Sequence, residues 1–119
     1  NFKQYNNATK IIIPNGVRLS STNFYNIFSC MGNIKEILMP HNITNLCMSF
    51  NGCYNLTSSP ICGDKVTNMY RTYNSCCSLT GSPICGKNVT DMAYTYSECP
   101  NLTGSPVCGE SVTNMHKTY

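Results

Sequence analysis

Apolar residues recur along the chain at 23-residue steps, and the last three units match one another without an insertion. The repeated positions carry cysteine, leucine, proline, glycine, valine, methionine and tyrosine. Among them are Cys53, Cys76 and Cys99; Leu56, Leu79 and Leu102; and Tyr73, Tyr96 and Tyr119. Self-similarity at a fixed period of this length is the sequence signature of a repeat architecture.

The repeated unit continues upstream in a weaker form. Ile43 and Leu46 stand 23 residues before Val66 and Met69. Further back, the segment around Phe28 matches only if one residue is deleted. We therefore expect a single repeat domain over residues 1–119 that is a fragment of a longer solenoid. Its approximate units are 11–27, 28–50, 51–73, 74–96 and 97–119.

Within a unit, the apolar spacing predicts a short helix and an extended segment. Steps of three and four along one helix face separate Val66, Met69, Tyr73, Cys76 and Leu79. The helix should run from about Asn68 to Ser75, with Thr67 or Asn68 as its cap. Proline and glycine favour an extended chain over 82–86. The predicted fold is a repeat solenoid, a leucine-rich-repeat-like stack of short parallel strands and short helical segments.

These patterns also resemble a known family. The stretches 11–17 and 37–46, and the spacing of Tyr73, Cys76 and Leu79, are similar to the BspA-like leucine-rich repeat, also called the Treponema pallidum type. That family has a unit of the same length, with a cysteine three positions after an aromatic residue and a leucine three after that. The resemblance implies a helix-and-strand solenoid displayed on a cell surface.

The chain departs from the family pattern at its prolines. Pro60, Pro83 and Pro106 stand where the family has an alternating apolar strand. Because proline cannot donate to a sheet ladder, we expect the sheet in these units to be reduced to a bridge or two, or to begin after the proline.

Composition argues against several classes of partner. Charged residues make up 11% of the chain, where soluble domains usually have about 25%. The net charge of +3 comes from scattered lysines and arginines, whereas nucleic-acid binding usually needs a clustered basic patch. No segment approaches the ~18 apolar residues that cross a bilayer, and nothing resembles a signal peptide. We expect no nucleic-acid partner and no membrane insertion in this segment.

The nine cysteines allow more than one interpretation. Their spacing does not match a zinc site. Disulfides between adjacent units remain possible, although the odd number leaves at least one thiol unpaired. We favour small buried residues that form structural ladders with the repeated leucines. The predicted ladder residues are Cys53, Cys76, Cys99, Cys62, Cys85, Cys108, Leu56, Leu79 and Leu102. Cys47 and Cys77 break the ladders and are expected to be exposed or reactive.

Aromatic residues divide into repeated and variable positions. Those that repeat are expected in the core, namely Phe50, Tyr73, Tyr96 and Tyr119. The variable ones, Tyr54, Tyr70 and Tyr94, mark an outward face. With Arg71 and Lys117 they predict a ligand-contacting stripe, although solvated surface variation gives the same pattern.

Nothing in the chain indicates catalysis. None of the five acidic residues recurs with a histidine at matched positions, and neither a phosphate loop nor a nucleophile elbow is present. We therefore expect no enzyme activity, no catalytic residue, no cofactor and no bound metal.

The resemblance implies an extracellular adhesion or recognition module that binds a protein or glycan on a cell surface. The alternative is a structural or receptor-binding part of a phage tail fibre or other virion appendage, which unbridged cysteines would suit. An intracellular interaction scaffold remains a third possibility. Open solenoid ends also predict self-association or continuation through those ends.

Overall fold

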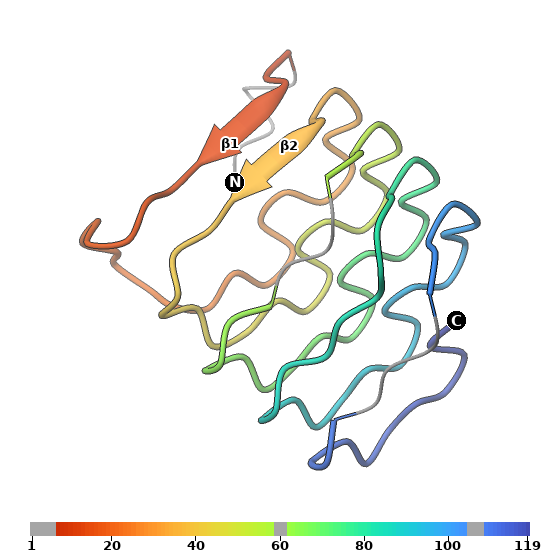
Figure 1. Ribbon diagram of the computed structural model, residues 1–119. Helices are drawn as coiled ribbons and strands as arrows, with labels where there is room; N and C mark the ends of the chain where they lie inside the picture. The colour runs from red at the N-terminus through yellow and green to blue at the C-terminus, as the bar shows by residue number, and fades with distance from the viewer. Residues whose placement is uncertain (1–6, 59–61, 105–108) are drawn as a thin grey trace.

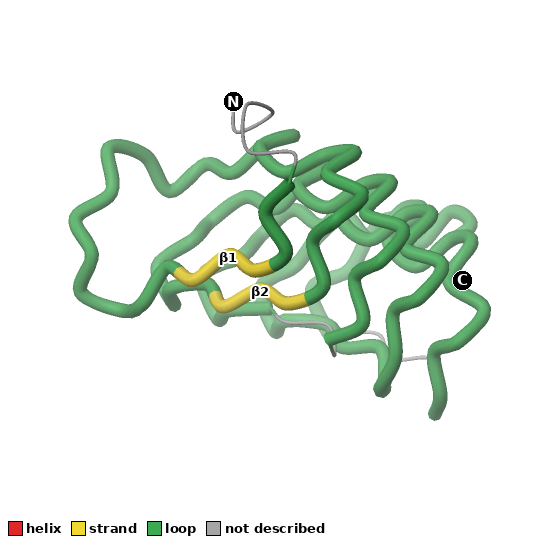
Figure 2. Tube along the Cα trace, turned by 90° about the horizontal axis from the view of Figure 1, so that it is seen from above, coloured by secondary structure: helices red, strands yellow, loops and turns green. Residues whose placement is uncertain are grey.

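The computed structural model describes residues 7–58, 62–104 and 109–119, which contain two short strands and no helix. Strand β1 (Lys10–Ile12) pairs in parallel with β2 (Glu36–Leu38), and Ile11 lies opposite Ile37 (Figure 1). Loops and turns make up the rest of the described chain, as the green tube in Figure 2 shows. The two strands therefore mark only one end of the molecule.

The predicted leucine-rich-repeat solenoid of strands and helical segments is wrong. The helix expected from Asn68 to Ser75 is absent, and residues 70–75 form turns instead. The molecule is compact, with a radius of gyration of 13.1 Å and extents of 35 × 29 × 19 Å. Globular chains of this length have a radius of gyration of roughly 13–14 Å. The described residues thus form a compact fold with a sheet of two strands.

The backbone amides of residues 69–76 show why no helix forms. The Thr72 amide donates to Met69 O within its own turn at 3.0 Å, whereas the Tyr73 amide donates to Thr95 O, also at 3.0 Å. An α-helix would direct every amide to the carbonyl four residues earlier. Arg71, with a φ of 52°, interrupts the helix as well, because L-residues disfavour the left-handed region. Consecutive tight turns therefore produce the spacing of three and four that indicated a helix.

Segments one repeat apart lie side by side in Figure 1 and are joined by isolated parallel bridges. The bridged pairs are Asn23–Asn45, Asn45–Asn68, Asn68–Asp91 and Asp91–Asn114. The side-chain oxygen at each of these positions accepts from the amide two residues later, for example Asn45 Oδ1 from Cys47 N at 2.8 Å. Such Asx turns reverse the chain locally, so the bridging residues also start the turns that follow.

Pro83 is the one repeated proline that the structure describes. There, the expectation of a reduced sheet is confirmed. No strand includes Pro83, which is buried in an irregular extended segment. Pro60 and Pro106 lie outside the described residues. A missing amide explains why this segment does not extend a ladder.

Stacked aromatic rings form the centre of the core. Phe50 and Tyr73 have ring centroids 5.6 Å apart, Tyr73 and Tyr96 5.7 Å, and both pairs are nearly parallel. Phe50, Tyr73 and Tyr96 are at most 2% exposed, which confirms their predicted core position. Tyr119 stacks on Tyr96 but is 47% exposed, so its predicted burial is wrong. Tyr119 is thus the most exposed ring of the stack.

A column of buried hydroxyl groups lies beside the rings. Thr72 Oγ1 donates to Leu46 O at 2.8 Å and Thr95 Oγ1 to Met69 O at 2.7 Å. Both threonines are fully buried. A buried hydrogen bond contributes about 1 kcal/mol, whereas a group left without its partner costs about 1–3 kcal/mol. The column therefore ties each segment to its neighbour inside the core.

We expect Thr95→Val to lower the free energy of unfolding by about 1–3 kcal/mol, because the variant keeps the volume but loses the donor to Met69 O. Urea titration followed by circular dichroism measures the difference. Thr90→Val is the matched control, since Thr90 is exposed and should change stability by less than about 0.5 kcal/mol. Equal losses in the two variants would contradict a structural role for the buried hydroxyl.

Candidate binding surface

A column of left-handed residues carries the most distinctive surface chemistry of the molecule. It comprises Asn26, Met48, Arg71, Tyr94 and Lys117, whose φ angles lie between 49° and 58°. Each residue occupies the same turn in successive segments. The Arg71 amide, for example, donates to Ala93 O at 3.0 Å, and the Tyr94 amide to His116 O at 2.9 Å. The backbone bonds are independent of the side chains, so this column presents whichever side chains the sequence supplies.

Four side chains of this region form the Arg71 cluster: Tyr70, Arg71, Tyr94 and His116. The guanidinium carbon of Arg71 lies 5.3 Å from the Tyr70 ring centroid and 4.8 Å from that of Tyr94. The two tyrosine rings meet edge to face at 6.1 Å, and Tyr94 meets His116 at 5.3 Å. Cation–π contacts contribute about 0.5–1 kcal/mol at exposed sites. These contacts restrict the plane of the guanidinium.

No acceptor within the described residues satisfies the Arg71 side chain. Its Nε is buried without a hydrogen-bond partner, and the ion pair found in this part of the chain joins Lys10 to Glu36. The Asp91 carboxylate accepts from the Ala93 amide at 2.9 Å. Lys117 is exposed and follows Tyr94 in the left-handed column. The unpartnered Nε is therefore closed to solvent, and Lys117 supplies an exposed positive charge next to the cluster.

The structure brings together three of the five residues predicted to contact a ligand, Tyr70, Arg71 and Tyr94, and places Lys117 one segment beyond them. Tyr54 lies elsewhere, 54% exposed and near Gly52 at the opposite turn. It does not belong to the cluster.

His116 is part of the cluster, although the sequence analysis did not select it. Its signal was present, because His116 stands two 23-residue steps after Tyr70 and so occupies the same position of the unit. Its backbone amide donates to Asn114 Oδ1 at 3.2 Å and makes no bond within the core. Extending the repeat by position, rather than by residue type, would have identified it.

In the inner cysteine ladder, Cys53 and Cys76 are buried as predicted, whereas Cys99 is half-buried. The Sγ atoms of Cys53, Cys76 and Cys99 donate to backbone carbonyls of the preceding segment at 3.2, 3.1 and 3.0 Å. Burial raises the pKa of the Cys53 thiol to about 12 and that of Cys99 to about 11. Burial raises the pKa of Cys76 as well. These thiols are neutral hydrogen-bond donors at ordinary pH.

The remaining ladder residues are placed less uniformly. Leu56 and Leu79 are fully buried, whereas Leu102 is half-buried. Cys62 and Cys85 are also half-buried, and burial raises the pKa of Cys62 to about 11. Cys108 lies outside the described residues.

One prediction about the irregular cysteines is confirmed and the other is wrong. Cys77 is exposed, as expected. Cys47 is buried, and this burial raises the pKa of its thiol, with a smaller contribution from the charge of Asp91. Cys47 occupies the position of Tyr70 one unit earlier, where a small side chain fits under its neighbours. In the described ranges Cys30, Cys47, Cys53, Cys62, Cys76, Cys77 and Cys99 are free.

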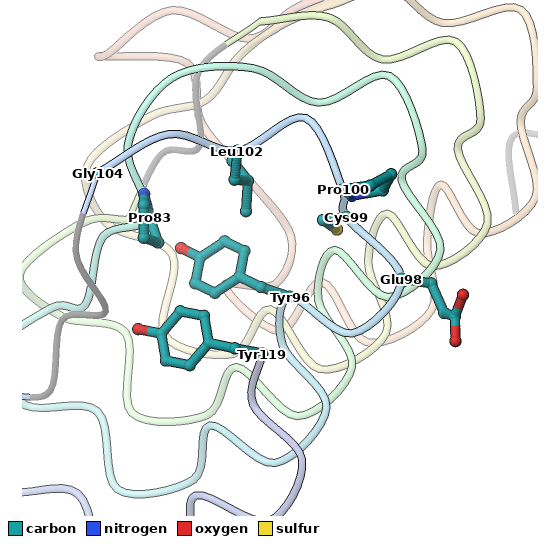
Figure 3. A pocket seen from close by; sticks show the side chains of 8 residues that line it. All are labelled: Pro83, Tyr96, Glu98, Cys99, Pro100, Leu102, Gly104 and Tyr119. Atoms are coloured by element: carbon teal, nitrogen blue, oxygen red, sulfur yellow. The ribbon is translucent and has the colours of Figure 1, made fainter.

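A shallow hollow of about 440 Å³ lies at the end of the ring stack (Figure 3). Tyr96 and Tyr119 line it with Pro83, while the Glu98 side chain points away. The Tyr96 hydroxyl donates to Ile84 O at 2.7 Å and accepts from Ile84 N at 3.0 Å. Because that hydroxyl is fully engaged in the fold, the hollow offers mainly apolar contacts and lacks the free polar groups of the Arg71 cluster.

Two further structural features bear on binding. Within 7–58, 62–104 and 109–119, no group of three or more histidine, cysteine, aspartate or glutamate side chains could hold a metal ion. No helix in the same ranges is long and apolar enough to span a membrane.

No family model matches the chain, and neither a curated protein nor a solved structure matches it. The resemblance to the BspA-like repeat therefore stays a prediction from residue spacing.

Burial should control the reactivity of the thiols. With an alkylating reagent at pH 8 we expect Cys30 and Cys77 to be modified first, because both are exposed. Cys53 should react only on unfolding, since the thiolate is the reactive form and a pKa of about 12 leaves it protonated. Mass-spectrometric mapping measures the order of modification, with labelling in denaturant as the control. Modification of native Cys53 as fast as Cys77 would contradict the buried ladder.

Proposed function

We propose that this chain is a recognition module that binds a protein or glycan partner on a cell surface through the Arg71 cluster and Lys117. The observation that carries the proposal is the guanidinium of Arg71, which lies 5.3 and 4.8 Å from two tyrosine ring centroids and forms no ion pair within the described residues. Tyrosine and arginine are also the residues most enriched where binding energy concentrates.

The backbone conformation supports the same surface. A non-glycine residue in the left-handed region costs about 1–2 kcal/mol, and asparagine tolerates that region best, as at Asn26. Arg71, Tyr94 and Lys117 occupy this position with large side chains that do not enter the core. Their side chains do not favour the turn, so an external partner accounts for their presence better than folding does.

The extracellular location rests on the resemblance to BspA-like repeats. Buried neutral thiols such as Cys53 suit that location, because a protonated thiol is a poor nucleophile for oxidation or exchange. Burial therefore protects ladder thiols such as Cys53 without a reducing compartment, although it does not protect the exposed Cys30 and Cys77.

We expect Tyr94→Gly to reduce binding without harming the fold. Glycine accepts the φ of 57° at this position, so stability should stay constant or rise by about 1 kcal/mol. The loss of the ring and of its contact with Arg71 should weaken binding about tenfold or more. The assay compares saturable binding of the labelled, reduced chain to host cells, matrix proteins and bacterial envelopes, with urea titration alongside.

Ser75→Gly is the matched control for this test. Ser75 has a φ of 61° in the other left-handed turn, so its replacement gives the same backbone relief outside the Arg71 cluster. Host-cell binding that Tyr94→Gly abolishes and Ser75→Gly preserves would support a surface adhesin. An absence of saturable binding to every material would refute the proposed recognition function.

A virion appendage, such as a phage tail fibre, is the second candidate. The observation that favours it is the exposed, unbridged state of Cys30 and Cys77, since assembly in a reducing cytoplasm leaves thiols unpaired. For this candidate we expect nine thiols to titrate when native material is unfolded without reductant. Disulfides in native material, or binding to host cells but not to bacterial envelopes, would count against it.

A further inference from the structure

We infer that Asn15 and Gly16 form a site of spontaneous modification, at which the Gly16 amide nitrogen cyclises onto the Asn15 side chain and converts Asn15 to isoaspartate. The product releases the loop after β1 from His41, whose amide the Asn15 side chain holds in the unmodified chain. This inference is independent of the Arg71 cluster and of the proposed recognition function.

The reaction needs only water in addition to the chain itself. The Gly16 nitrogen attacks Asn15 Cγ, so that a bond from this nitrogen to Cγ forms and the Cγ–Nδ2 bond breaks. The Gly16 amide proton leaves with Nδ2 as ammonia, and a five-membered succinimide ring remains. Water then opens the ring at Cγ, which gives aspartate, or at the backbone carbonyl of residue 15, which gives isoaspartate. No group is oxidised or reduced in either step.

The sequence contains two pairs at which this cyclisation is least hindered. Glycine has no Cβ beside the attacking nitrogen, so a backbone amide can approach a side chain closely there. Asparagine precedes glycine at Asn15–Gly16 and again at Asn51–Gly52. Because the reacting residues are the same in both pairs, the fold decides which pair reacts.

The side-chain carbonyls of the two asparagines are placed alike. Asn15 Oδ1 accepts a hydrogen bond from His41 N at 2.8 Å. Asn51 Oδ1 accepts one from Asn74 Nδ2, also at 2.8 Å. Attack on Cγ moves negative charge onto Oδ1, and a donor at this distance stabilises that charge. These contacts favour the reaction at both asparagines, so they do not distinguish the pairs.

The attacking amide is held in place at Gly52. Gly52 N donates to Asn74 O at 2.9 Å, as one of the bonds that join successive segments. Gly52 is also buried. Its nitrogen can reach Asn51 Cγ only after this bond opens and the segment unfolds locally, which costs free energy. The fold therefore protects the Asn51–Gly52 pair.

The attacking amide is free at Gly16. Within the described residues Gly16 N donates to no acceptor, and both Asn15 and Gly16 are exposed. The turn around them is closed by the bond from Val17 N to Pro14 O, which at 3.5 Å is long and weak. No described atom beyond the chain neighbours of Gly16 lies within 4 Å of the position that a Cβ would occupy. This turn can therefore rearrange to the geometry of attack without breaking the stack.

The modification would change how the loop is attached. The bond from His41 N to Asn15 Oδ1 joins the loop after β1 to the segment after β2. In isoaspartate the Cβ and Cγ atoms enter the main chain, and the former backbone carboxyl group becomes a shorter side chain. The acceptor for His41 N then moves, while the main chain gains an atom. We expect the loop to detach at this point, beside a hollow of about 580 Å³ that Asn15 and His41 help to line.

The test is incubation of the native full chain in neutral buffer at physiological temperature. Peptide mapping by mass spectrometry, with isoaspartyl methyltransferase labelling, measures conversion at each asparagine. We expect Asn15 to convert at least about tenfold faster than Asn51, because Asn51 reacts only through local unfolding. The same chain in denaturant is the control. There the two pairs should convert at similar rates, since each asparagine is followed by glycine.

A variant tests the attacking residue. Gly16→Asn adds a Cβ beside the nitrogen and should slow conversion of Asn15 at least about tenfold. Asparagine tolerates a positive φ better than other side chains, and the space at this position is open, so the variant should fold. Urea midpoints confirm that folding is retained.

Hydrogen exchange at the His41 amide measures release of the loop. The purified isoaspartate product is compared with Asn15→Asp, which keeps an oxygen acceptor at the end of a side chain of the original length. We expect exchange at least about tenfold faster in the isoaspartate product.

The outcomes decide each step. Equal conversion of Asn15 and Asn51 in the native chain would overturn the inference, as would an Asn15 that stays intact while the denatured chain converts. An unchanged rate in folded Gly16→Asn would exclude cyclisation through this nitrogen. Equal His41 exchange in the product and in Asn15→Asp would refute release of the loop. The binding assays test the recognition function separately, and its failure leaves these results unaffected.

Discussion

Backbone hydrogen bonding between successive segments is the constraint on which the rest of this structure depends. Amides alternate between an acceptor in their own turn and an acceptor in the following segment, as Thr72 and Tyr73 do. This division satisfies buried backbone groups, which every fold must do, without a helix and with one sheet of two short strands in the described residues. It also requires left-handed residues at the same position of each segment. The chain must turn there between one amide that donates to the following segment and the next such amide.

The same constraint explains why small polar residues line the core. The carbonyl of Met69 accepts from the Thr72 amide at 3.0 Å and from Thr95 Oγ1 at 2.7 Å. The Cys99 thiol reaches back in the same way to Tyr73 O, at 3.0 Å. A carbonyl has two lone pairs, and a hydroxyl or neutral thiol can occupy the second without adding charge. Burial raises the pKa of the ladder thiols and keeps them protonated, so they remain donors where a thiolate would be excluded.

Much of the core could be predicted from the sequence, whereas the backbone that carries it could not. Cys53, Leu56 and Tyr73 are buried as their repetition indicated, because equivalent residues meet in the interior. The helix over 68–75 was wrong because steps of three and four arise equally from consecutive turns. The residues that distinguish the two, such as Arg71 and Ser75 with positive φ, are not types that favour the left-handed region. Nothing in their identity reveals that conformation.

The first full unit shows a second limit. Phe28 stacks on Phe50 at 5.6 Å across a step of 22 residues, so Cys30 lies beside Gly52 and is exposed. A one-residue change in step moves a cysteine from the core to the surface, and only the hydrogen-bond register shows which residues are equivalent. Variability located the neighbouring side chains Tyr70, Arg71 and Tyr94, but it does not report exposure by itself, because Cys47 is buried at the position that Tyr70 occupies one unit later.

The left-handed column lies outside the buried core, which separates its side chains from folding. Side chains there form no part of the ring stack or of the hydroxyl and thiol columns, so one can change without altering the hydrogen bonds that join the segments. The column nevertheless inherits the regular spacing of those segments, about 4.8 Å. Substitutions in the column are therefore expected to change the surface more than the fold.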